Sequence, residues 1–107
     1  QDKAFLSRLY AVMDESLSNS EVDINRIAEI MKISRTNFYY KVKSLTGETP
    51  STFYRNYKFN KAITLMKEGK YNLTEIAFMT GFSSSSQFST SFKKHFGVSP
   101  KEYRQRF

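Results

Sequence analysis

The amino-acid sequence predicts an all-α fold with seven helices, arranged as two helix-turn-helix lobes that a long central helix joins. Three observations lead to this prediction. Apolar residues recur at the three-to-four-residue spacing of a helix along nearly the whole chain. Residues that favour helix N-caps precede most of these apolar runs. No useful length of the chain alternates apolar and polar residues with the period of two that a half-buried strand shows.

The first half of the chain contains signals for three helices. A first amphipathic helix is expected to close at Leu17. Asp23 suits the N-cap of a second helix and Ser34 that of a third, because their side-chain oxygens can accept a free N–H of the first turn. Gly47 follows Thr46 and ends the third helix, since glycine tolerates the left-handed C-cap conformation. The side chains expected to face inward are Phe5, Leu9, Val12, Met13, Ile24, Ile27, Ala28, Met31, Phe38, Val42 and Leu45.

The second half begins with the longest predicted helix. Pro50, after Thr49, suits its first position, where the missing N–H costs nothing, and Gly69 ends it after Glu68. A helix over 50–68 is about 28 Å long at 1.5 Å per residue. Three later helices begin with pairs that resemble capping boxes, namely Asn72 with Glu75, Ser84 with Gln87, and Ser99 with Glu102. Lobe one is expected over about 1–48, the central helix over about 50–68, and lobe two over about 72–107.

The composition is that of one folded domain. Its 107 residues are 39% hydrophobic and 16% aromatic, too apolar for a disordered chain. The lack of cysteine excludes disulfides, thiolate catalysis and Cys-ligated zinc, and it fits a cytoplasmic location. No run of 18 apolar residues predicts a membrane span. The chain starts at Gln1 with neither an initiator Met nor a signal peptide, so we expect a fragment of a longer protein.

The charge is distributed unevenly along the chain. The net charge is +7, of which residues 1–32 carry −2 and residues 33–107 carry +9. A one-sided basic charge favours a polyanionic partner, with nucleic acid first and a membrane surface second. A soluble basic protein without such a partner would have the same charge. The distribution alone does not decide between them.

The chain contains an internal repeat. The segment "IAEIMKIS" (27–34) resembles "IAFMTGFSS" (76–84), and "SRTNFYYKVKSLTGETP" (34–50) resembles "SSSSQFSTSFKKHFGVSP" (83–100). The separation is 49 residues before the turn and 50 after it, so the second copy has one extra turn residue. A solenoid would need more copies. The matched pairs are Ile27/Ile76, Ala28/Ala77, Ser34/Ser84, Phe38/Phe88, Lys43/Lys93, Gly47/Gly97 and Pro50/Pro100.

Each copy reads as a short helix, a tight turn and a helix with one apolar stripe, which is the helix-turn-helix pattern. Ala28 and Ala77 would let the second helix of each pair cross closely. A plain αα-hairpin has the same packing needs and stays an alternative. Successive major-groove faces of B-DNA lie about 34 Å apart. A connecting helix of about 28 Å could hold two reading helices near that separation within one chain.

The string "GF(x)5FSTSFKKHFGVSPKEYR" resembles the signature of the AraC family of bacterial transcription regulators. The resemblance implies two helix-turn-helix lobes that bind adjacent major grooves of promoter DNA, and activation of transcription through contact with RNA polymerase. Lys58 departs from the family, which often has Arg there, and an ammonium cannot make a bidentate contact. The residues that carry the resemblance are Phe88, Phe92, Lys93, Gly97, Ser99, Pro100, Tyr103 and Arg104.

The leading segment, "DKAFLSRLYAVMDESLSNSEVDINRIAEIMKISRTNFYYKVKSLTGETPSTF", also resembles output domains at the C-terminal end of hybrid two-component regulators. This second resemblance implies a phosphorelay upstream of the domain. Sensing is then expected in a preceding region, through which the protein could also dimerise.

In the predicted recognition helix of lobe one, Thr36, Tyr40 and Lys43 point away from the apolar side. The resemblance supports Arg35, Thr36, Tyr39 and Tyr40 as contacts to bases or backbone. Arg35 is the best candidate for guanine, because its donors match O6 and N7 together. A surface salt bridge is the alternative for Arg35. Tyr39 and Tyr40 could instead pack on a neighbouring helix.

In lobe two, Ser86, Thr90 and Lys93 point away from the apolar side, and Ser85 and Gln87 complete the candidate base contacts. Gln87 could pair with adenine N6 and N7, or it could complete a capping box with Ser84. Phosphate contacts would set the register without reading sequence, although a solvated charge is the alternative for each cation. The phosphate candidates are Lys41, Lys43, Arg55, Lys93 and Lys94.

Other functions have weaker support in the sequence. His95 is the one histidine and is expected at the surface or near the end of its helix. No spacing pairs acids for general acid/base work, and no glycine-rich phosphate loop is present. We therefore expect neither an enzyme nor a metal or cofactor site. A basic helical module that docks an acidic protein remains the alternative, and RNA binding lacks the usual aromatic platforms.

Overall fold

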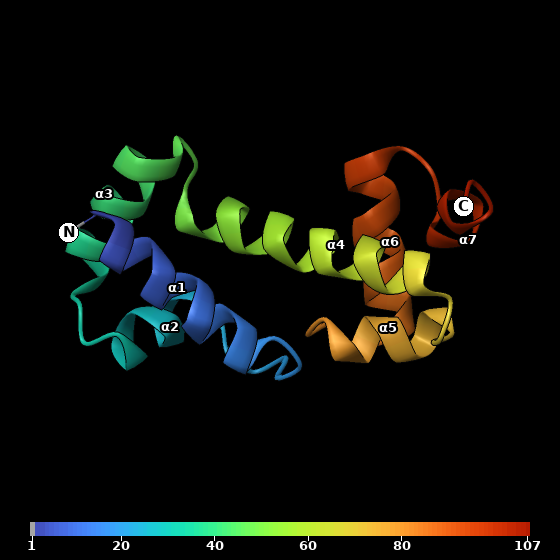
Figure 1. Cartoon of the computed structure of the whole chain (residues 1–107), viewed down its shortest axis with the longest axis horizontal. Helices are drawn as coiled ribbons and strands as arrows, with labels where there is room; N and C mark the ends of the chain where they lie inside the picture. Colours follow the sequence, from blue (N-terminus) through green and yellow to red (C-terminus); the bar gives the residue numbers. More distant parts are fainter. Residues whose placement is uncertain (1) are drawn as a thin grey trace.

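The computed structural model describes residues 2–107 and confirms the all-α fold (Figure 1). Within these residues there are seven helices and no strand. Two lobes lie at the two ends of a molecule of 41 × 23 × 22 Å, and one helix runs between them. The helices are α1 (Asp2–Ser16), α2 (Ile24–Ile30), α3 (Arg35–Thr46), α4 (Pro50–Glu68), α5 (Leu73–Met79), α6 (Ser85–Phe96) and α7 (Pro100–Arg104).

Local capping explains where these helices begin and end. Each predicted N-cap side chain accepts the backbone N–H three residues later, which satisfies one of the free donors of the first turn. Gly47 and Gly69 end α3 and α4 in the left-handed conformation, as predicted. The reciprocal capping boxes at the starts of α5 and α7 are also present. The N-caps are Asp23, Ser34, Thr49, Asn72, Ser84 and Ser99.

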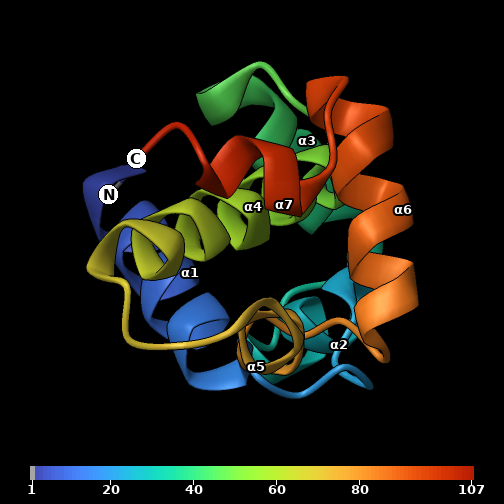
Figure 2. The ribbon, with the colours of Figure 1, turned by 90° about the vertical axis from the view of Figure 1, so that its right-hand side faces the viewer.

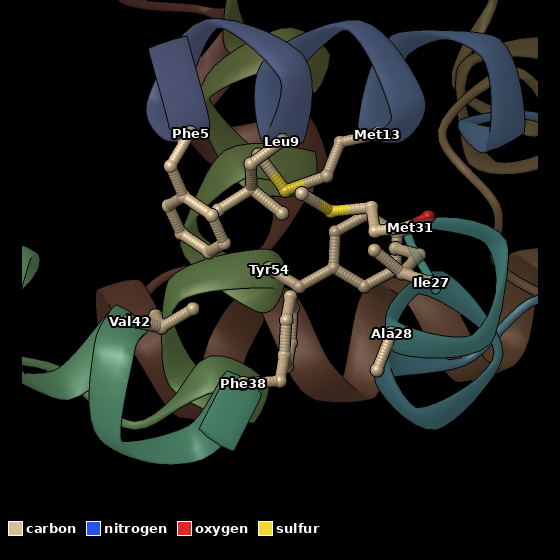
Figure 3. Close-up of a cluster of buried hydrophobic side chains, with 9 residues drawn as sticks. All are labelled: Phe5, Leu9, Met13, Ile27, Ala28, Met31, Phe38, Val42 and Tyr54. Atoms are coloured by element: carbon tan, nitrogen blue, oxygen red, sulfur yellow. The ribbon is translucent and has the colours of Figure 1, made fainter. Parts of the chain in front are cut away.

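Each lobe has its own hydrophobic core. Core one lies between α1, α2, α3 and the first turns of α4, and Figure 3 shows its side chains converging from these four helices. Core two lies between the rest of α4, α5 and α6. The buried members of core one are Phe5, Leu9, Met13, Ile27, Ala28, Met31, Phe38, Val42 and Tyr54. Those of core two are Phe59, Ala62, Met66, Ile76, Ala77, Phe82, Phe88 and Phe92.

Helix α4 belongs to both lobes. Tyr54 is buried in core one, and Phe59, five residues later, is buried in core two. Ala28 and Ala77 are buried in the first helix of their respective helix-turn-helix pairs, where the sequence predicted small residues. Because one continuous helix enters both cores, the lobes are joined by a rigid element.

The lobes also touch away from α4. A Cβ built on Gly81, in the turn before α6, would clash with the carbonyl oxygen of Leu17, the residue that follows α1. Gly81 has φ +83°, which also favours glycine. Its repeat counterpart Lys32 has φ 60°. Because Lys32 adopts a positive φ without being glycine, the close approach to Leu17 is what requires glycine in the turn of lobe two, and the backbone conformation only favours it.

Candidate nucleic-acid interface

The outer face of α3 is polar and exposed, as the sequence predicted. Phe38 and Val42 anchor the helix in core one. Tyr40 is 66% exposed and Tyr39 41% exposed, and their rings meet edge to face with centroids 5.4 Å apart. The exposed candidate residues on this helix are Arg35, Thr36, Tyr39, Tyr40, Lys41 and Lys43.

Arg35 and Tyr39 lie at the edge of a recess of about 200 Å³ between α2, α3 and the start of α4, which Ile24 and Ser51 also line. Arg35 forms no ion pair with any of residues 2–107, so the salt bridge considered as its alternative role is not formed there. Tyr39 does border a neighbouring helix, but the residue stays 41% exposed. Both side chains are therefore available to a ligand.

The outer face of α6 is also polar and exposed, but its side chains are small. Phe88 and Phe92 anchor this helix in core two. The run of serines is part of the helix and its cap, since Ser84 accepts the backbone N–H of Gln87 and α6 starts at Ser85. The exposed candidate residues on this helix are Ser85, Ser86, Gln87, Thr90, Lys93 and Lys94.

Gln87 departs from the capping box predicted with Ser84. Its side-chain Oε1 accepts the backbone N–H of Ser83 at 2.7 Å and the Ser83 hydroxyl at 2.9 Å. In a capping box the Gln87 side chain would accept the backbone N–H of the N-cap, Ser84. Here it accepts that of Ser83, the residue before the N-cap. Ser83 is the extra turn residue of the second repeat, so lobe one has no counterpart for this contact. The Gln87 oxygen is already bonded, and only its amide nitrogen remains free to donate.

Helices α4 and α6 enclose a recess of about 330 Å³ that brings together two of the predicted phosphate contacts, Arg55 and Lys94. Ser91 and His95 complete its lining. Neither Arg55 nor Lys94 forms an ion pair within residues 2–107. Sequence reasoning did not place Ser91 or His95 here. The only signal was that positions 91, 94 and 95 share one face of α6.

The ring of His95 is fixed by aromatic packing, although the side chain is exposed. It stacks on Phe59 with centroids 4.8 Å apart and an interplanar angle of 23°, and it meets the edge of Phe96 at 4.6 Å. The sequence-based expectation of a surface position is therefore correct. The stacking orients the imidazole beside the recess.

Lys58 occupies the joint between the lobes. Its ammonium lies 4.5 Å from the ring centroid of Tyr54 and 5.7 Å from that of Phe82, as in cation–π contacts. Burial lowers the pKa of Lys58, because the charged form loses hydration. These contacts bind Lys58 to core residues of both lobes, and a planar guanidinium is not needed for them.

Among residues 2–107 no group of three or more His, Cys, Asp or Glu side chains could hold a metal ion. No helix in this part of the chain combines the length and the apolar character needed to cross a membrane.

Comparisons with known proteins agree with this geometry. A helix-turn-helix domain family matches residues 27–106. Histidine kinase P4 of Formosa agariphila is 27% identical over 99% of this chain and 8% of its own length. The transcriptional activator RhaS of Escherichia coli is 32% identical over 94% of this chain and 36% of its own length. The chain thus spans about a third of RhaS or less than a tenth of P4.

Among solved structures, the DNA-binding domain of AdpA, in complex with a target DNA, superposes with a TM-score of 0.82. It is 28% identical, and the match covers 94% of this chain and 90% of that one. Its likeness extends over both lobes and α4. The family match and the two helix-turn-helix lobes together show that the chain belongs to the AraC-type helix-turn-helix DNA-binding domains.

Proposed function

We propose that this chain binds double-stranded DNA sequence-specifically and regulates transcription, with α3 and α6 entering successive major grooves. The supporting observation is the pair of exposed polar helix faces, each anchored in its own core and both carried by one rigid helix (Figure 1). A recognition helix must present polar side chains to base edges without losing its packing. Both helices meet this requirement.

Lobe one carries the larger share of direct base readout in this proposal. Arg35 is the candidate for guanine, and Thr36, Tyr39 and Tyr40 contact bases or backbone beside it. Lobe two presents Ser85, Ser86 and Thr90, and Gln87 contributes its amide nitrogen as a donor. The phosphate contacts that set the register are Lys41, Lys43, Arg55, Lys93 and Lys94.

The regulatory setting is proposed from the relatives. RhaS is an activator, and P4 is a histidine kinase with the matched segment in a small part of its length. We infer that the domain activates transcription in the cytoplasm, through RNA polymerase, as the output of a two-component phosphorelay. Dimerisation through other regions of the protein is part of the same proposal. The function assigned to this domain is binding rather than catalysis.

DNA binding is tested first by selection from fragmented genomic DNA, followed by affinity measurement on the selected duplex at several salt concentrations. The log of the affinity should fall linearly with the log of the salt concentration, with a slope of about −0.9 per phosphate contact. Failure to select any duplex, or affinity that ignores salt, would contradict the proposal. It would favour the alternative, a basic module that docks an acidic protein.

The roles of the two lobes are tested with Arg35→Ala and Lys93→Ala. Arg35→Ala should cost about 1–3 kcal/mol mainly at one base position of one half-site, because a bidentate base contact is lost. Lys93→Ala should weaken all sequences alike and reduce the salt slope by about 1. Affinities for operator variants with single base changes would separate the two effects. Uniform weakening by both variants would show that the assignment of roles is wrong.

A further inference from the structure

Three recesses of the surface lie between the recognition helices. The recess beside Arg35 shares Ile24 and Ser51 with a second recess of about 220 Å³ at the joint between the lobes. The second recess shares Arg55 with the recess between α4 and α6 that Lys94 lines. The three recesses, called the trough, therefore adjoin one another in a row from α3 to α6.

One face of α4 forms the floor of this trough. Ser51, Arg55 and Lys58 follow each other by four and three residues, so they share one side of the helix. The opposite side of α4, around Tyr57, faces a separate recess that Tyr10 of α1 lines. Viewed along the molecule, α1 and α6 lie on opposite sides of α4 (Figure 2). The trough is thus confined to the side of α4 that carries α6.

The trough has an excess of positive charge without internal neutralisation. Arg35, Arg55 and Lys94 form no ion pairs within residues 2–107. The acid that lines the trough, Asp23, accepts the backbone N–H of Arg26 at 2.9 Å as the N-cap of α2. The surface therefore suits a run of anions and offers little to a cation.

Tyr54, a buried residue of core one, borders the middle of the trough. Tyr54 is 4% exposed, and its hydroxyl has no hydrogen-bond partner in the described chain. Its side chain lines the second recess together with Lys58.

We propose that the trough seats the DNA backbone that connects the two half-sites, with one phosphate held in the α4–α6 recess. Arg55 and Lys94 supply the charge, and Ser91 and His95 supply further donors to the phosphate oxygens. This proposal rests on the proposed function and adds to it a phosphate contact between the two grooves. The contact reads no sequence but sets the spacing of the half-sites.

The experiment uses the selected duplex with single neutral methylphosphonates placed one at a time across the segment between the half-sites. At one or two adjacent central positions the substitution should lower the affinity about tenfold and reduce the salt slope by about 0.9 per lost contact. In the double variant Arg55→Ala/His95→Ala the same substitution should have little further effect. The matched control Lys67→Ala lies outside the trough and should keep the full response, and circular dichroism checks the folding of each variant.

If every central phosphate is dispensable while both half-sites are still required, the trough proposal is overturned and the proposed function stands. If the double variant responds to neutralisation as strongly as the unaltered protein, the phosphate is held elsewhere and the proposal is again overturned. If no duplex is bound at all, the proposed function itself fails, and the trough proposal fails with it.

Discussion

Lobe one and lobe two share one backbone plan, yet their recognition helices differ in almost every outward side chain. Tyr40 of α3 is replaced by Thr90 in the second repeat, and Arg35 by Ser85. One inward position differs as well, since Val42 corresponds to Phe92, whereas Phe38 and Phe88 are the same. The repeat therefore keeps the helix caps and part of the core, while the length of the turn and most of the binding face have diverged.

The two cores achieve burial in different ways. Core one mixes aliphatic, methionine and aromatic side chains, which can adjust to one another. Core two is dominated by phenylalanine, and the ring of Phe92 packs against those of Phe59, Phe88, Phe96 and Tyr103. A packed aromatic cluster has few alternative arrangements. Truncating a core side chain should consequently lower the free energy of unfolding more in lobe two than in lobe one.

The largest expected effect tests this difference. Phe92→Ala should lower the free energy of unfolding by about 3–5 kcal/mol, because it removes the centre of the aromatic cluster. Val42→Ala, at the equivalent position, should cost about 1–2 kcal/mol for the smaller volume removed. Urea denaturation followed by circular dichroism measures both. Equal losses would show that the aromatic cluster gives lobe two no special dependence on one residue.

The turns provide the second test. Gly81→Ala should destabilise the protein by about 2–4 kcal/mol, since the new Cβ meets the Leu17 carbonyl oxygen and the backbone has a positive φ. The matched change Lys32→Gly in lobe one should alter stability by about 1 kcal/mol or less, as relief of φ strain and added chain entropy oppose each other. Thermal unfolding compares the two. A tolerated Gly81→Ala would mean that the lobes can separate at this contact.

The third test concerns the inserted residue of lobe two. Gln87→Ala should lower stability by about 1 kcal/mol, because its carbonyl oxygen bonds Ser83 at the start of α6. Its repeat counterpart Asn37 lacks such an inserted partner, so Asn37→Ala should leave stability nearly unchanged. Urea denaturation curves of the two variants measure this difference in stability. A loss of base discrimination by Gln87→Ala at one operator position, without loss of stability, would support adenine readout instead.

The smallest effect is expected in the pH dependence of stability. Hydrogen bonds from the Ser99 backbone and hydroxyl lower the pKa of Glu102 below its usual value of 4.5. The charged carboxylate therefore contributes stability at pH above 4.5, and this contribution is lost as the pH falls through the lowered pKa. Glu102→Gln should flatten the acid side of the stability profile.

The equivalent position in the first repeat is Thr52, which does not titrate in this range. Thr52→Ala should lower stability by a similar amount at every pH, because it removes the Thr49–Thr52 side-chain bond without removing a charge. An unchanged acid profile in Glu102→Gln would show that the capping carboxylate is not linked to folding.

Local features of the fold were predictable from the sequence because their causes are local. A cap such as Ser34 or a stop such as Gly69 depends on residues within one helical turn. The trough was not predictable, since it depends on how α6 crosses α4 and on which side of α4 receives Arg55. The contact of Gln87 was missed for another reason. The capping pattern pairs Ser84 with Gln87, but the Gln87 side chain bonds the inserted residue Ser83, one position earlier.

Because α4 is continuous through both cores, the phase between the lobes is fixed by residue count. One residue inserted between Tyr54 and Phe59 would turn lobe two by about 100° and advance it by about 1.5 Å. Seven residues would nearly restore the angle but lengthen the span by about 10 Å, roughly a third of a turn of B-DNA. A short insertion in α4 therefore cannot restore the angle between the lobes and also keep both recognition helices in register with the DNA grooves. Single substitutions on α3 or α6 can therefore change the bases that are read, but they cannot change the spacing between the two half-sites.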